Sequence, residues 1–139
     1  LHPSADTTLT IPSTARRVAA VGAYDSRTLT YADFSGRGNT RDLREKPILV
    51  APGVRVLTTA LGDTYAEATG TSFATPFVTG AAALLLQWGI VDGNDPYLYG
   101  EKAIAYLKKG TRPLPAYAEY PNPEVGWGAL CIKQSLPEI

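Results

Sequence analysis

A long apolar segment, residues 71–88, sets the strongest limit on how this chain can fold. Residues 80–86 read Gly-Ala-Ala-Ala-Leu-Leu-Leu, so a helix built from them is apolar on every side. Such a helix needs cover all round, and we expect it to be central and buried. Widened to residues 73–90, the segment still carries Thr75, Pro76, Thr79 and Gln87, which favours a core helix over a membrane span.

Short apolar or alternating runs predict strands elsewhere, and a Gly-rich, charged stretch between them predicts an exposed loop over residues 35–46. The strands are expected over residues 18–24, 29–34, 48–51 and 54–58. Pro52 and Gly53 should stop the third of these strands. Buried strands together with helices indicate an α/β domain.

A second helix is predicted over residues 96–109, with Asp95 as its N-cap and Pro96 at its first position. Gly110 is expected to end it in the left-handed conformation. Its buried stripe should consist of Tyr97, Gly100, Ile104 and Leu107. Residues 111–128 should be irregular, and a last short helix is expected over residues 129–136.

The amino-acid composition excludes several classes of function and of binding site. The 13 basic and 13 acidic side chains cancel, which excludes nucleic-acid binding or a polybasic membrane surface as the main role. One cysteine, Cys131, cannot form an internal disulfide, and one histidine, His2, cannot build a multi-histidine zinc site. The 139 residues make one domain at most. Because the chain starts at Leu1 and has no methionine, we expect a processed or excised piece.

The segment 70–80 places Ser72 where a loop turns into the apolar helix. Free N–H groups at a helix N-terminus favour negative charge, so a developing oxyanion beside Ser72 would be stabilised. Gly70 and Ala74 are small and let a substrate backbone come close. Pro76 has no N–H to give the Ser72 carbonyl, which loosens the first turn. For an isolated Gly-Thr-Ser triplet, simple helix capping is the more common interpretation.

The full string Gly-Thr-Ser-Phe-Ala-Thr-Pro-Phe-Val-Thr-Gly, residues 70–80, resembles the nucleophile motif of the subtilisin-like serine proteases at every fixed position. Four weaker segments match that family in the expected order. They are Val-Gly-Ala with Asp25, Phe-Ser-Gly-Arg-Gly at 34–38, Ala-Pro-Gly-Val at 51–54 and Gly-Trp-Gly-Ala-Leu at 126–130. Residues 87–102 are similar to a narrower group, the clostridial spore-germination (Csp-type) subtilases.

This resemblance implies the C-terminal half of a three-layer α/β fold with a mostly parallel sheet. It implies that residues 1–139 are one portion of a single catalytic domain, whose buried helix carries Ser72 as nucleophile and oxyanion donor. Thr69, Gly70 and Thr71 would contact substrate, with Thr69 standing where asparagine is frequent. Phe77 replaces a frequent, non-catalytic histidine.

The aspartate and histidine motifs of the family, and its oxyanion asparagine, are absent from this chain. The resemblance therefore implies a partner, an N-terminal half that supplies all three, and a peptide or protein substrate. His2 is better interpreted as a loop residue than as the base. No cofactor is predicted; calcium in the parent protein is left open, as is location, which would be secreted or spore-associated if the subgroup resemblance holds.

Other chemistries fit less well. Ala74 breaks the Gly-x-Ser-x-Gly elbow of the α/β-hydrolases, and no histidine follows Ser72. Cys131 as a nucleophile lacks a partner histidine. Two alternatives to a protease remain: an inactive, subtilase-like binding or regulatory module, and a stable proteolytic product with only a structural role.

Overall fold

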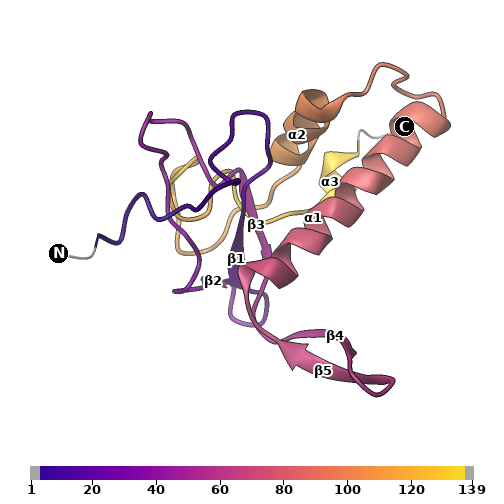
Figure 1. Cartoon of the computed structure of the whole chain (residues 1–139). Helices are drawn as coiled ribbons and strands as arrows, with labels where there is room; N and C mark the ends of the chain where they lie inside the picture. Colours follow the sequence, from indigo (N-terminus) through magenta and orange to yellow (C-terminus); the bar gives the residue numbers. More distant parts are fainter. Residues whose placement is uncertain (1–3, 137–139) are drawn as a thin grey trace.

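The computed structural model describes residues 4–136, so His2 lies outside the described residues. Five strands come first and the helices follow (Figure 1). The strands are β1 (Val21–Asp25), β2 (Thr30–Tyr31), β3 (Leu49–Pro52), β4 (Val56–Ala60) and β5 (Thr64–Ala68). The helical elements are α1 (Thr71–Leu86), the π-helical turn η1 (Gln87–Val91), α2 (Gly100–Lys109) and α3 (Ile132–Ser135).

The central sheet has the order β2-β1-β3. β1 and β3 are parallel, with Val21 opposite Leu49, whereas β2 pairs antiparallel with only the last two residues of β1. The free side of β3 is closed by the chain after residue 127, because the Val50 N–H donates to the Gly128 carbonyl at 3.0 Å. β3 is therefore flanked on both sides, which explains its continuous apolar sequence.

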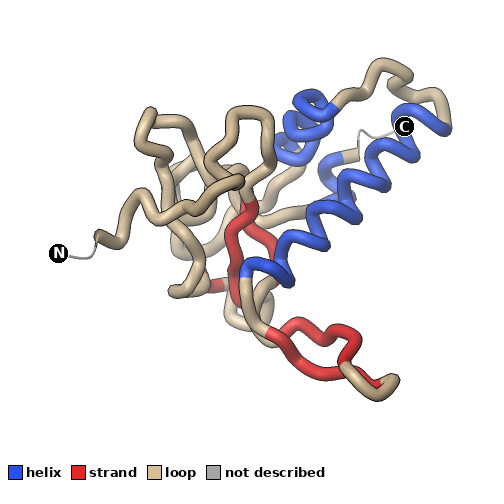
Figure 2. Tube along the Cα trace, in the orientation of Figure 1, coloured by secondary structure: helices blue, strands red, loops and turns tan. Residues whose placement is uncertain are grey.

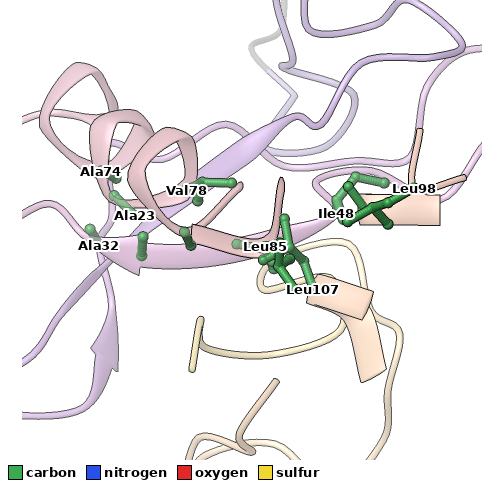
Figure 3. Packing of buried hydrophobic residues seen from close by; sticks show 12 residues of the cluster. Ala23, Ala32, Ile48, Ala74, Val78, Leu85, Leu98 and Leu107 are labelled. Carbon is green, nitrogen blue, oxygen red and sulfur yellow. The ribbon is translucent and has the colours of Figure 1, made fainter. Parts of the chain in front are cut away.

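One face of α1 packs on this sheet (Figure 3). Its buried residues, Ala74, Val78, Ala81 and Leu85, follow spacings of four, three and four along the helix. They meet strand residues that include Ala23 of β1. The small side chains at the start of α1 let the helix lie close to the sheet, and Leu85 fills the space toward Leu107 of α2.

The expectation that α1 is covered on every side is wrong for this chain. Phe77 is 43% exposed and Leu84 is 55% exposed, because the described residues pack against only one side of the helix. By length and composition alone, the continuous helical stretch Thr71–Val91 would suffice to cross a membrane. Core helices of globular proteins pass the same test, so a single helix of this kind is weak evidence.

The predicted second helix begins later than expected. Residues 96–99 are not helical, and α2 starts at Gly100. Asp95 does not cap it, because its carboxylate instead accepts hydrogen bonds from Lys102 Nζ at 2.6 Å and the Tyr106 hydroxyl at 3.1 Å. Tyr97 is 87% exposed rather than buried.

The end of α2 and its inward face also differ in part. Gly110 has φ −88°, which is not left-handed, and its N–H donates the regular α-helical bond to the Tyr106 carbonyl at 3.1 Å. Ala103 replaces Gly100 on the buried face, whereas Leu107 is buried as predicted. The last helix exists but is confined to α3.

β4 and β5 form a separate antiparallel hairpin that projects from the body (Figure 2). β4 confirms the strand predicted near residues 54–58, and the predictions for β1 and β3 are also confirmed within a few residues. The strand predicted over residues 29–34 shrinks to the two residues of β2. β5 was missed. Within the predicted exposed loop, Ser35, Thr40 and Lys46 are buried.

Candidate functional site

A turn between β5 and α1 positions Ser72. Gly70 stands before the helix with φ 154° and ψ 158°, a backbone conformation that favours glycine. The Gly70 N–H donates to the Gly53 carbonyl at 2.8 Å, and the Phe73 N–H donates back to the Gly70 carbonyl at 3.1 Å. These bonds fix the start of α1 against the end of β3.

Gly53 is needed for this close approach. A Cβ at this position would lie 2.6 Å from the Ala23 Cβ and 3.0 Å from the Gly70 carbonyl oxygen. Only a residue without a side chain lets β1, β3 and the turn before Ser72 meet there. The glycine of the Ala-Pro-Gly segment therefore lets β3 pack directly against the turn that holds the serine motif.

Ser72 is exposed and is the second residue of α1. Its N–H belongs to the first turn, whose N–H groups have no partner within a helix. No acidic side chain in that turn competes for the positive end of the helix dipole. Among residues 4–136, no side chain bonds to the Ser72 hydroxyl. The arrangement can stabilise an oxyanion, but the described residues hold no base for the hydroxyl.

The neighbouring threonines hold the turn. Thr69 Oγ1 accepts a hydrogen bond from the Arg55 N–H at 3.0 Å, which ties the turn to the start of the hairpin. The Thr71 carbonyl accepts one from Thr75 Oγ1 at 3.0 Å. Pro76 lies inside α1, as predicted, so the Ser72 carbonyl lacks the usual donor four residues on.

Ser72 opens onto a cavity of about 840 Å³ that we call the Ser72 cavity. Three other parts of the chain line it: the stretch from Ala5 to Ser13, the stretch from Val18 to Val21, and the stretch from Asp33 to Arg37. Thr71 and Thr75 line it beside Ser72. The hydroxyl is therefore accessible from an open hollow, which the enzymatic interpretation requires.

The wall of the cavity is well anchored. Ser35 is buried, and its Oγ accepts the Ala23 N–H at 3.0 Å, which joins the 33–37 wall to β1. The Thr8 N–H donates to the Arg37 carbonyl at 2.9 Å, and the Arg37 guanidinium meets the Glu124 carboxylate at 2.9 Å. These contacts hold segments distant in sequence around Ser72.

Two groups near the cavity, Tyr31 and Asp25, have shifted pKa values that follow from structural contacts. Burial raises the pKa of Tyr31, which keeps its hydroxyl neutral as a donor to the Ser35 carbonyl. The Arg27 N–H, with a smaller effect of Arg55, holds the pKa of Asp25 below its usual range. Asp25 therefore stays ionised and anchors the end of β1 to Arg55 at 3.4 Å.

The other candidate groups considered do not belong to this site. Cys131 is half-buried beside α3 and does not line the Ser72 cavity. In the part of the chain that the structure describes, no group of three or more His, Cys, Asp or Glu side chains could hold a metal ion. The sequence reasoning missed Asp33, which lines the cavity directly before the Phe-Ser-Gly-Arg-Gly segment.

Comparison with known proteins shows which protein family this chain matches. The profile of the Subtilase family matches residues 2–97. The serine protease AprX of Bacillus subtilis is 33% identical over 150 residues, which cover 94% of this chain and 32% of that protein. Subtilisin BL of Lederbergia lenta is 43% identical over 84 residues, 60% of this chain and 29% of that protein. The chain thus spans about a third of the length of these curated relatives.

Solved structures of proteases share the fold of this chain. The Clostridium perfringens CspB protease superposes with a TM-score of 0.92 at 43% identity, covering 97% of this chain and 29% of that chain. The prenylagaramide maturation protease PagA superposes with a TM-score of 0.73 at 28% identity, covering 94% of this chain and 46% of that chain. The subtilisin-like fold and the similarity to Csp-type subtilases are confirmed.

Proposed function

Because the chain belongs to the subtilase family of serine proteases, we propose that it carries the nucleophile of a serine endopeptidase and that this nucleophile is Ser72. The observation that supports this most is the exposed Ser72 hydroxyl at the N-terminus of α1, opening onto the Ser72 cavity. Gly70, Thr71 and Thr69 are proposed to contact the substrate, since they form the turn that presents the serine.

The proposed reaction proceeds in two steps. Ser72 Oγ attacks the carbonyl carbon of the scissile bond, its proton passes to a histidine, and the amine leaves with that proton. Water then attacks the acyl-enzyme, and the carboxylic acid product departs as the Ser72 hydroxyl is restored. In each step the Ser72 N–H at the positive end of α1 stabilises the oxygen that becomes negative.

An N-terminal portion of the same protein is proposed to supply the aspartate, the histidine and an oxyanion asparagine. Two features of the described residues support such a partner. The N-terminal part of β1 has no strand opposite it on the β2 side. An apolar groove of about 500 Å³ runs along the uncovered side of α1, lined by Phe73, Phe77 and Leu84. Both are places where further chain would bury apolar or unpaired backbone surface.

By itself the chain is proposed to be essentially inactive. Serine is a poor nucleophile without a base, and the described residues bring none to Ser72. The relevant magnitude is the one known for subtilisin itself, a member of the same family, in which loss of triad members leaves a residual ~10³–10⁴-fold acceleration over water.

The proposal is tested by peptidase assays on the complete protein. We expect hydrolysis of an unfolded protein substrate by the wild type and a loss of at least about 10³-fold for Ser72→Ala. Ser26→Ala, which removes an exposed hydroxyl that does not line the cavity, should retain activity. A complete, folded protein that cleaves nothing would instead support the inactive binding module.

A further inference from the structure

The charged side chains in the Ser72 cavity do not balance each other. Only two of the described side chains that line it are charged, Asp33 and Arg37. The Arg37 guanidinium is already engaged: it lies 2.9 Å from the Glu124 carboxylate, and its central carbon lies 5.3 Å from the centre of the Tyr31 ring. Its positive charge is therefore largely neutralised by the wall of the cavity.

Asp33 has no such partner. It is exposed, and its carboxylate forms no ion pair with any residue from 4 to 136. The basic residues that precede β1 lie elsewhere, since Arg17 pairs with Glu101 at 3.0 Å and neither Arg16 nor Arg17 lines the cavity. Among the described residues, the cavity beside Ser72 thus has one negative charge without an ion-pair partner.

Apolar side chains share the cavity with this charge and with several hydroxyl side chains. Phe34 follows Asp33 directly and is 50% exposed, and Leu9 and Val18 line the same hollow. A lysine or arginine side chain can lay its aliphatic stem on such surfaces while its charged end meets a carboxylate. An acidic or purely apolar side chain would leave either a repulsion or an unpaired charge.

We propose that Asp33 is a specificity-determining residue that favours substrates with a lysine or arginine side chain close to the scissile bond. The inference rests on the proposed peptidase function of Ser72. Asp33 takes no part in bond breaking; it selects the side chain that lies in the cavity while Ser72 acts.

The test compares three forms of the complete protein: the wild type, Asp33→Asn and the control Asp63→Asn. Asp63 is a carboxylate in the β4–β5 turn, away from the cavity, and its φ of 56° suits asparagine. Cleavage sites in a peptide library are mapped by mass spectrometry, and kcat/KM is then measured for matched peptides with lysine or glutamine at the enriched position. We expect a lysine preference that falls roughly fivefold in Asp33→Asn, weakens at high salt and persists in Asp63→Asn.

A binding measurement separates the proposed peptidase function of Ser72 from the proposed selectivity role of Asp33. Ser72→Ala with fluorescent lysine and glutamine peptides should show the same preference, and Ser72→Ala/Asp33→Asn should lose it. Binding selectivity without cleavage by the wild type would overturn the peptidase proposal and keep the role of Asp33. Cleavage with no preference for basic residues, or a preference unchanged by Asp33→Asn, would overturn the role of Asp33 and keep the peptidase.

Discussion

At the scale of single residues, the position of Ser72 depends on Gly53, where any side chain would clash with its neighbours. Gly53 lets the end of β3 touch Ala23 and the carbonyl of Gly70, and Gly70 adopts the backbone conformation that starts α1. Two glycines thus set the position of Ser72, the proposed nucleophile.

Gly53→Ala should therefore disturb both stability and the site. The new Cβ would overlap Ala23, and relief requires a shift of β3 or of the turn before Ser72. We expect a loss of about 1–3 kcal/mol in the free energy of unfolding, with reduced kcat/KM, measured by urea unfolding and peptidase assay of the complete protein. Gly100→Ala, where a Cβ meets nothing within 4 Å, is the matched control and should unfold no more easily. Equal stability of the two variants would contradict this role of Gly53.

At the scale of elements, the core depends on one stripe of α1. Leu85 of α1 is fully buried in the same cluster as Leu107 of α2, whereas most of the other large side chains of α1 face outward. The contact of α1 with the sheet is thus narrow, and each residue in the stripe contributes strongly.

Leu85→Ala should cost roughly 2–5 kcal/mol of unfolding free energy, because it leaves a cavity among residues that cannot collapse around it. Leu61→Ala, at the hairpin tip with the leucine 98% exposed, should change stability by less than about 0.5 kcal/mol. Chemical unfolding of both variants of the complete protein checks this, and a Leu85→Ala variant as stable as Leu61→Ala would show that α1 is held from its other side.

The junction between η1 and α2 should respond to acid. The Lys102 ammonium, assisted by the Tyr106 hydroxyl, holds the pKa of Asp95 below its usual range. A lowered pKa in the folded state stabilises the protein above the unfolded pKa, near about 4, and this contribution disappears as the pH falls through the folded value. Asp95→Asn should therefore lower stability at pH 7 more than at pH 3, as followed by urea unfolding. An equal loss at both pH values would contradict it.

Much of this arrangement follows from the sequence, and the exceptions have physical causes. The apolar runs of β1 and β3 were predictable because burial leaves a local pattern, and the start of α1 was predictable from the Gly-Thr-Ser motif, although no side chain caps that helix. β5 was not, because Thr-Tyr-Ala-Glu-Ala combines two good strand formers with three poor ones and is largely exposed on both faces, so it shows no apolar alternation. Asp95 was misassigned because its partners lie seven and eleven residues away. The Ser72 cavity combines four distant segments, which no local pattern reveals.

At the scale of the whole molecule, the described residues leave apolar surface uncovered. Phe77 and Leu84 of α1 stay exposed along an apolar groove, and within residues 4–136 no strand pairs with the N-terminal part of β1 on the β2 side. Apolar surface of this kind is typical of a site where further protein docks.

The isolated 139-residue chain should therefore bind a hydrophobic dye and melt over a broad range, because large apolar side chains of α1 stay exposed. Calorimetry and dye fluorescence of the isolated chain and of the complete protein make the comparison. A sharp, cooperative transition of the isolated chain with no dye binding would contradict this view of the fold.

The proposed function requires Ser72 to be a nucleophile whose base comes from a part of the protein outside residues 4–136. A serine-directed phosphonate probes this division, because it reacts only with an activated hydroxyl and its adduct can be mapped by peptide mass spectrometry. We expect labelling of Ser72 in the complete protein, none in Ser72→Ala and none in the isolated 139-residue chain. Efficient labelling of the isolated chain, or an adduct on another serine of the complete protein, would show that this assignment is wrong.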